Sequence, residues 1–183
     1  MKALTTDEYK TLIQTIKTGC GSLRANPRIA AVLTAEANLG MRVGDIVRLR
    51  LCDIIRDGNR YRLNVIEEKT GKRRTFTVPD AVYGFFCDYA KANNIGPTER
   101  LFDITVRQVQ RGLKKACEAL GYTNVSTHSF RKWYATDIYE ASGHDIVLVQ
   151  ELLQHSSAMV TRRYIGLSDE KVERAIANHV LIA

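Results

Sequence analysis

Apolar positions recur at helical spacing in the first fifty residues, and capping residues divide them into helices. Thr5 is followed three residues later by Glu8, which is the capping-box pattern that begins a helix. Asn26-Pro27 offers a second N-cap with proline at the first helical position, and glycines close both stretches. The pattern predicts a helix after Thr5, a second over residues 28–39 and a short third over residues 45–49.

The pattern changes to the alternation of half-buried strands after Cys52. Asp57-Gly58 is a hairpin turn signal, and the apolar residues after it alternate with polar ones. A second polar turn follows, so the segment predicts a three-stranded antiparallel meander over residues 52–56, 60–65 and 74–78. Its exposed face is unusually basic, with Arg60, Arg62, Lys69, Lys72, Arg73 and Arg74.

Helical spacing returns at Pro79 and continues to the end of the chain. Glycines punctuate the pattern, which predicts further helices over residues 80–93, 106–120, 130–141, 145–154 and 158–165. Ser168 caps a last amphipathic stretch that carries Val172, Ile176 and Val180 on one face. The expected fold class is therefore mainly α with one small three-stranded antiparallel sheet, an α+β protein.

Composition adds a basic balance to this picture. The 183 residues include 27 Lys and Arg against 20 Asp and Glu, a net charge of +7. This excess fits a polyanionic partner, because neutralising phosphates releases counterions, although many basic proteins never bind nucleic acid. No apolar run approaches the roughly 20 residues that span a bilayer, and the N-terminus lacks the apolar stretch of a secretory signal. We therefore expect an intracellular, cytoplasmic protein.

The four cysteines, Cys20, Cys52, Cys87 and Cys117, are widely spaced and form no C-x-x-C pair. A zinc site needs clustered ligands, and a disulfide framework suits a small secreted chain, so neither interpretation fits. We expect reduced thiols that serve mostly in packing.

Two pairs of residues carry possible phosphate chemistry in the helical parts. His128 and Arg131 lie three apart in THSFRKWY, so both face one side of a helix. An arginine can hold phosphate oxygens as a planar fork while a histidine moves a proton near neutral pH. Arg42 follows Gly40, with Asp45 as a candidate ionic partner. Taken alone, each pair is better explained by a structural role: a capping histidine with a surface arginine, or a simple ion pair.

Three further residues can each be explained by an ordinary structural role when taken alone. Lys69 lies at a hairpin tip, where most lysines are only solvated, although a mobile lysine there can donate a proton to a leaving oxygen. His155 ends LLQHSS, at a helix C-terminus that favours histidine through the helix dipole. Tyr164 lies in TRRYIG near the C-terminus, and its basic surroundings are unusual for a packing tyrosine.

The order and spacing of these residues resemble the catalytic series of the tyrosine recombinases, or phage integrases. LTAEANLGMRVGDIVRLRLCDI resembles the first family motif, and EEKTGKRRTFTVP resembles its lysine hairpin. HSFRKWYAT and LLQHSSAMVTRRYIGL resemble the last two motifs almost without departure. The resemblance covers the whole catalytic domain of the family, residues 1–183, and implies that domain's fold.

The resemblance also implies a role for each matching residue. Tyr164 would be the nucleophile that forms a 3′-phosphotyrosyl bond with DNA, and Lys69 would protonate the leaving 5′ oxygen. The remaining series would bind and activate the phosphate, with Asp45 supporting the first arginine: Arg42, His128, Arg131 and His155. Basic residues of the hairpin and of the tyrosine motif would contact DNA: Lys72, Arg73, Arg74, Arg162 and Arg163. No metal, ATP or other cofactor is implied, and the sequence has no P-loop or acidic metal cluster.

Family likeness implies partners and a wider context as well. We expect double-stranded DNA as the partner, a homotetramer on two DNA sites, and a monomer or weak oligomer without DNA. The chain starts where the catalytic domain of the family starts, so we expect a truncated form that lacks the N-terminal DNA-clamping domain. Residues 168–183 resemble the C-terminal helix, which packs either on a neighbouring protomer or on its own domain. A nucleoid-associated enzyme of bacterial, phage or conjugative-element origin is expected, with a role in integration or excision of a mobile element.

Other classes of function fit less well. A type IB topoisomerase shares this chemistry but usually has lysine in place of His128. A catalytically silent DNA-binding relative would have lost at least one residue of the series. A metal-dependent nuclease would need clustered carboxylates, which the sequence lacks.

Overall fold

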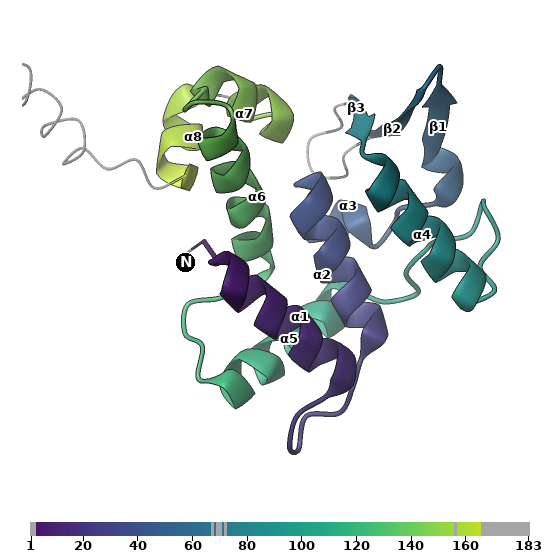
Figure 1. Ribbon diagram of the computed structural model, residues 1–183, viewed down its shortest axis with the longest axis vertical. Helices are drawn as coiled ribbons and strands as arrows, with labels where there is room; N and C mark the ends of the chain where they lie inside the picture. The colour runs from purple at the N-terminus through teal and green to yellow at the C-terminus, as the bar shows by residue number, and fades with distance from the viewer. Residues whose placement is uncertain (1–2, 67, 69–70, 72, 156, 166–183) are drawn as a thin grey trace, which may run out of the picture. The chain divides into compact units, whose positions relative to one another are not determined.

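The structure, a computed structural model, describes residues 3–66, 68, 71, 73–155 and 157–165. The chain divides into two compact units, Met1–Tyr134 and Ala135–Ala183 (Figure 1). Among the described residues, none of the helices is both long enough and apolar enough to cross a bilayer. The amphipathic stretch predicted from Ser168, with Val172, Ile176 and Val180, lies outside the described residues.

The first unit is built around one buried helix, α2 (Pro27–Leu39). Its side chains are buried on almost every face, which is the pattern of a helix inside a core. The helices α1 (Thr6–Thr18) and α5 (Val106–Leu120) both pack against it. Local signals set its ends, because Asn26 Oδ1 accepts the Ile29 N–H at 3.1 Å and Gly40 closes the helix in a left-handed conformation.

A three-stranded antiparallel sheet in the order β1-β2-β3 belongs to the same unit, as the sequence predicted. The strands are β1 (Ile54–Asp57), β2 (Arg60–Ile66) and β3 (Arg73–Val78). Leu63, in the central strand, is fully buried and pairs with Ile54 on one side and Phe76 on the other. Tyr61 stacks on Tyr83 of α4 (Asp80–Ala92), with ring centroids 3.8 Å apart, so α4 covers one face of the sheet.

The helix α6 (Thr127–Ala141) begins in the first unit and continues into the second. Two short helices, α7 (Ile146–Leu153) and α8 (Ala158–Ile165), follow it and pack against each other. Val149 and Leu153 are buried in this second unit. The predicted fold class, mainly helical with one small antiparallel sheet, is confirmed.

Three predicted elements were wrong by two or more residues at one or both ends, and each contains a polar side chain whose contact the sequence analysis did not anticipate. The predicted helix over 45–49 is α3 (Val43–Ile46), and Asp45 lies inside it. The predicted strand over 52–56 starts later, because the Asp53 carboxylate accepts the Arg50 N–H at 2.8 Å and closes a 3₁₀ turn, η1 (Leu51–Asp53). The helix predicted from residue 130 starts a turn earlier, because Ser129 Oγ accepts the Ser126 N–H at 3.2 Å.

Candidate active site

Arg131 lies in the second turn of α6 and is only 2% exposed. Its Nη1 donates a hydrogen bond of 2.6 Å to the carbonyl of Gly40, at the C-terminal end of α2. A buried guanidinium needs such acceptors, because desolvation removes the water that would otherwise satisfy it. The contact therefore fixes one of the two predicted phosphate-binding arginines against the central helix.

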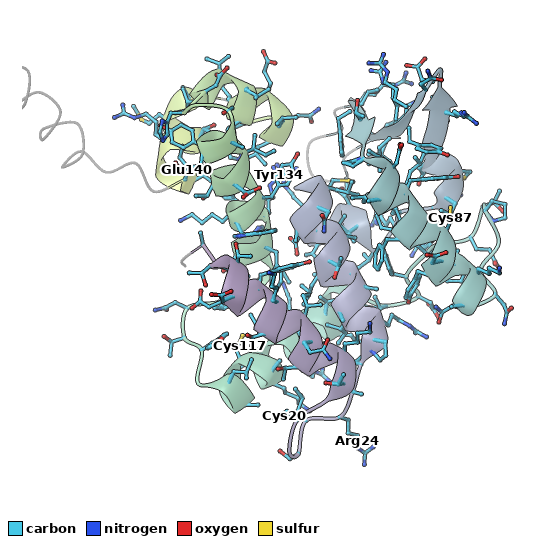
Figure 2. All side chains as sticks on the ribbon, in the orientation of Figure 1. Cys20, Arg24, Cys87, Cys117, Tyr134 and Glu140 are labelled. Atoms are coloured by element: carbon cyan, nitrogen blue, oxygen red, sulfur yellow. The ribbon has the colours of Figure 1, made fainter. Side chains whose placement is uncertain are left out.

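Gly40 makes this close approach possible. Its φ of +57° belongs to the left-handed region, and an added Cβ would lie 2.3 Å from the ring of Tyr134, which is labelled on α6 in Figure 2. Any side chain at position 40 would therefore push α6 away from α2. The glycine of the first family motif thus lets α6 come close enough for Arg131 to reach the Gly40 carbonyl.

Arg42 and His128 lie near this junction in the chain. Arg42 is half-buried at the N-cap of α3, two residues after the carbonyl that Arg131 binds. His128 is exposed, one helical turn before Arg131 on α6. Residues three apart on a helix lie on one face, so His128 and Arg131 share a side of α6.

Asp45 anchors the base of the hairpin that carries Lys69. Its Oδ1 accepts the backbone N–H of Glu68 at 2.9 Å, and the Glu68 carboxylate forms an ion pair with Arg48. Lys69 itself lies outside the described residues. The contact of Asp45 Oδ1 therefore fixes the residue beside Lys69, and the support of Arg42 by Asp45 stays a prediction.

The basic face of the sheet is partly neutralised by one carboxylate. Asp57 accepts hydrogen bonds from Arg62 (3.2 Å) and Arg60 (3.3 Å). These two guanidinium groups lower the pKa of Asp57 from its ordinary value. The pairs are exposed to solvent, so their contribution to stability is small.

The other predicted DNA-contacting residues are only partly described. Arg73 is exposed at the start of β3, and Arg162 is half-buried on α8. Lys72 lies outside the described residues. The side chains of Arg74 and Arg163 also lie outside the described part, although their backbones belong to β3 and α8.

The second unit brings His155 and Tyr164 together. Their rings meet edge to face with centroids 5.0 Å apart, and both side chains are half-buried. His155 follows the left-handed Gln154 that ends α7, while Tyr164 lies on α8. The histidine of one motif is therefore positioned beside the tyrosine of the next.

Thr161 is a site residue that the sequence analysis did not single out. It is fully buried on α8, one turn before Tyr164, and its Oγ1 lies 3.1 Å from His155 Nδ1. This contact holds the His155 ring on its Nδ1 side, and the same hydroxyl donates to the Ser157 carbonyl at 3.5 Å. The only sequence signal was the spacing of Thr161 and Tyr164 on one helical face.

Glu36, in the last turn of α2, is a second residue that the sequence analysis missed. It is 0% exposed, and neither carboxylate oxygen has a hydrogen-bond partner of good geometry among the described residues. Burial raises its pKa well above the ordinary value, while the nearby Arg131 guanidinium and Val43 N–H lower it in part. An acidic residue within an apolar helix was the available sequence signal.

The cysteines and metal-ligand types form no site in the part of the chain that the structure covers. That part holds no group of three or more His, Cys, Asp or Glu side chains that could bind a metal ion. All four cysteines are free of disulfides. Cys117 (Figure 2) is buried, which raises its pKa to about 11. The packing role predicted for the cysteines is wrong for Cys20 and Cys52, which are exposed.

Comparison with known proteins agrees with the resemblance seen in the motifs. The model of the phage integrase family matches residues 2–171. The probable integrase/recombinase YoeC of Bacillus subtilis is 31% identical over 160 residues, which cover 84% of each chain. The tyrosine recombinase XerC of Caldanaerobacter subterraneus is 30% identical over 189 residues, 97% of this chain and 51% of the relative.

Solved structures share the fold. The XerH site-specific recombinase, bound to a palindromic difH substrate in a post-cleavage complex, superposes with a TM-score of 0.70 at 19% identity. The match covers 96% of this chain and 52% of XerH, so the chain spans about half the length of XerH and of the XerC relative. The predicted catalytic-domain fold is thereby confirmed. The chain belongs to the phage integrase family, the tyrosine recombinases.

Proposed function

We propose that this chain is the catalytic part of a site-specific DNA recombinase that works through Tyr164. The Tyr164 oxygen attacks a backbone phosphorus of DNA, loses its proton, and forms a 3′-phosphotyrosyl ester. The bond from phosphorus to the 5′ oxygen breaks, and Lys69 gives that oxygen a proton. A 5′-hydroxyl from another strand then attacks the phosphotyrosine and restores the tyrosine. One ester bond replaces another at each step, so neither ATP nor a metal ion is needed.

Charge on the phosphate would be stabilised by fixed cations and hydrogen-bond donors. Arg42 and Arg131 bind the non-bridging oxygens, where negative charge grows in the transition state. His155 donates a hydrogen bond to the phosphate through Nε2, in the orientation that Thr161 sets. His128 manages the proton of the nucleophile, a role that fits its exposed place one turn before Arg131.

The observation that carries the proposal is the pairing of His155 with Tyr164 in the second unit. A packing tyrosine would be buried among apolar side chains, whereas Tyr164 is half-buried against a histidine ring 5.0 Å away. The histidine is itself oriented by a buried hydroxyl. This arrangement supports a tyrosine that takes part in chemistry.

The substrate is double-stranded DNA, and the recombination step uses a homotetramer on two DNA sites, with a monomer or weak oligomer in the absence of DNA. XerH was solved on its DNA substrate, which supports a DNA partner for this chain. Exposed Arg73 and half-buried Arg162 contribute to phosphate binding together with Lys72, Arg74 and Arg163. We propose a bacterial or mobile-element enzyme that acts on the nucleoid in integration or excision. Residues 1–183 form the catalytic domain, and residues 168–183 are a C-terminal helical tail that docks on a neighbouring protomer or on its own domain.

Relaxation of a supercoiled plasmid in EDTA tests the mechanism without knowledge of the cognate site. The wild-type chain is expected to relax the plasmid and to leave a protein–DNA adduct that resists SDS. Tyr164→Phe is expected to bind the plasmid with normal affinity and to do neither, because it lacks the nucleophilic oxygen. The paired measurement of binding by gel shift and of adduct by SDS gel separates loss of chemistry from loss of affinity.

Two outcomes would reject the proposal. Relaxation or an adduct in Tyr164→Phe would remove Tyr164 from its role. Activity that disappears in EDTA and returns with Mg²⁺ would favour the nuclease class instead. Relaxation by the wild type followed by recombination between two mapped sites would distinguish a recombinase from a topoisomerase-like enzyme.

A further inference from the structure

The Glu36 carboxylate is placed where a stable core would have an apolar side chain. It belongs to a helix whose neighbours along the chain are buried apolar residues, and it is 0% exposed. Neither oxygen has a hydrogen-bond partner of good geometry within the described ranges. A buried carboxyl group without such partners is expensive in free energy, and space filling alone would be served better by leucine or methionine. The position therefore calls for a reason other than packing.

Arg131 supplies that reason, since its charge lies close enough to lower the pKa of Glu36. The two side chains come from the central helix α2 and from α6, and both are fully buried. The backbone of Gly40 connects Glu36 and Arg131 as well. Its N–H donates to the Glu36 carbonyl at 2.9 Å, and its carbonyl accepts from Arg131 Nη1 at 2.6 Å. The last turn of α2 therefore holds the guanidinium through the Gly40 carbonyl and places the Glu36 carboxyl group beside it.

We propose that Glu36 is a positioning residue for Arg131, because its carboxyl group holds the guanidinium in the orientation that binds the DNA phosphate. This inference rests on the proposed function, because it assumes that Arg131 contacts the phosphate. A guanidinium has five N–H donors in one plane. Fixing the plane of this fork from the α2 side sets its orientation before DNA arrives, so that phosphate binding needs no reorganisation.

The first test observes Arg131 directly and needs no DNA. Protein labelled with ¹⁵N-arginine reports each side-chain N–H, and the Arg131 signal is assigned by its absence from Arg131→Lys. The Arg131 N–H is expected to exchange slowly with water in the wild type and at least about tenfold faster in Glu36→Gln, which keeps the shape but replaces the carboxyl group with an amide. Glu118→Gln is the matched control, because Glu118 is exposed and pairs with Lys114 at 3.8 Å.

The second test measures plasmid relaxation with protein in excess over DNA. Glu36→Gln is expected to lower the rate by about tenfold to a hundredfold, the scale of a misplaced catalytic group, while DNA affinity stays within about twofold. Glu36→Asp keeps the charge on a shorter side chain and is expected to recover part of the rate. Combined with Arg131→Ala, Glu36→Gln is expected to add no further loss, because both changes remove one interaction.

Several results would overturn the inference. One is an Arg131 exchange rate and a relaxation rate in Glu36→Gln that both equal those of Glu118→Gln. Another is a double variant of Glu36→Gln and Arg131→Ala whose loss of rate equals the product of the two single losses. Loss of signal dispersion for all arginines in Glu36→Gln would show a purely structural role. A wild type that relaxes no plasmid would instead count against the proposed function, and the exchange measurement would still decide whether Glu36 orders Arg131.

Discussion

Two residues of the candidate site act by holding a neighbour in place. Thr161 Oγ1 lies 3.1 Å from His155 Nδ1 and holds the ring on that side, and Glu36 lies beside Arg131 at the end of the central helix. Both are fully buried, so neither contacts DNA in the proposed mechanism. Their expected influence is on orientation and charge, which distinguishes them from Tyr164.

The raised pKa of Glu36 predicts how stability depends on pH. The folded chain holds the Glu36 proton more tightly than the unfolded chain does, because burial outweighs the opposing effects of Arg131 and the Val43 N–H. The stabilisation from this group is complete below the unfolded pKa, about 4.5, and is lost as pH rises through the folded pKa. Each tenfold gain in proton affinity on folding corresponds to about 1.4 kcal/mol. The amide of Glu36→Gln does not titrate, so this variant is expected to lack the decline in stability with rising pH.

Urea unfolding of the wild type and Glu36→Gln at intervals from pH 4 to pH 8 checks this expectation. The unfolding free energy of Glu36→Gln is expected to rise relative to that of the wild type as pH rises above about 4.5. Glu118→Gln, which changes an exposed carboxylate, serves as the reference. Curves for the wild type and Glu36→Gln that stay parallel over the whole range would show that the Glu36 pKa is not raised by folding.

At the scale of elements, α3 connects the first arginine motif to the lysine hairpin. Arg42 begins this helix, Asp45 lies in its middle, and Arg48 follows it. The latter two both bind Glu68, which precedes Lys69 in the sequence. A four-residue helix thus fixes the base of the segment that carries the proposed general acid.

Asp45→Ala is expected to act on cleavage through Lys69. Loss of the Glu68 N–H acceptor frees the base of the hairpin, so Lys69 should protonate the leaving oxygen less efficiently. We expect cleavage of ordinary DNA to slow by about tenfold, with most of the rate restored when sulfur replaces the 5′ oxygen, because a thiolate leaves without a proton. The assay uses a duplex taken from the site at which the wild type forms its adduct.

The same experiment separates two roles for Asp45. Equal slowing on the oxygen and sulfur substrates would indicate support of Arg42, as the sequence analysis expected, rather than of the hairpin. Lys69→Ala on both substrates is the reference for complete loss of the proton donor.

Element boundaries could be predicted wherever a local cap determines them. The capping box of Thr5 and Glu8 is present in the structure, and α5 and α8 have the predicted bounds. Prediction failed for the start of α3, and the Asp45 carboxylate inside that helix binds a distant backbone N–H. The Arg131–Gly40 bond joins residues 91 positions apart, and no local pattern carries such information. The identities of the proposed catalytic residues came from motif spacing, whereas Glu36 and Thr161 required the packing of elements.

At the scale of the whole molecule, the surplus of positive charge is the feature that bears on DNA. Part of the net charge of +7 is neutralised locally, because Asp57 pairs with Arg60 and Arg62 of the sheet and Glu68 pairs with Arg48, which follows α3. Arg73, at the start of β3, is exposed, so we choose this hairpin arginine to test a phosphate contact.

Arg73→Ala is expected to weaken DNA binding uniformly across sequences. One lost phosphate contact should reduce the slope of log affinity against log salt concentration by about one, since fewer counterions are released. Arg24 in the loop between α1 and α2, at the end of the first unit away from the hairpin (Figure 2), provides the control. Titrations of both variants from low to moderate salt measure the slopes. An unchanged slope in Arg73→Ala, or the same change in Arg24→Ala, would exclude a specific phosphate contact at Arg73.

The buried carboxylate of Glu36 also has a consequence for redesign of this catalytic domain. A procedure that selects sequences for thermal stability would replace Glu36 early, with leucine or methionine, because a buried acid in the central helix scores as a defect. The resulting chains would keep the helices, the sheet and the proposed catalytic residues. Their recombination would nevertheless be impaired, so stabilised versions of this domain should keep position 36 fixed along with the proposed catalytic residues.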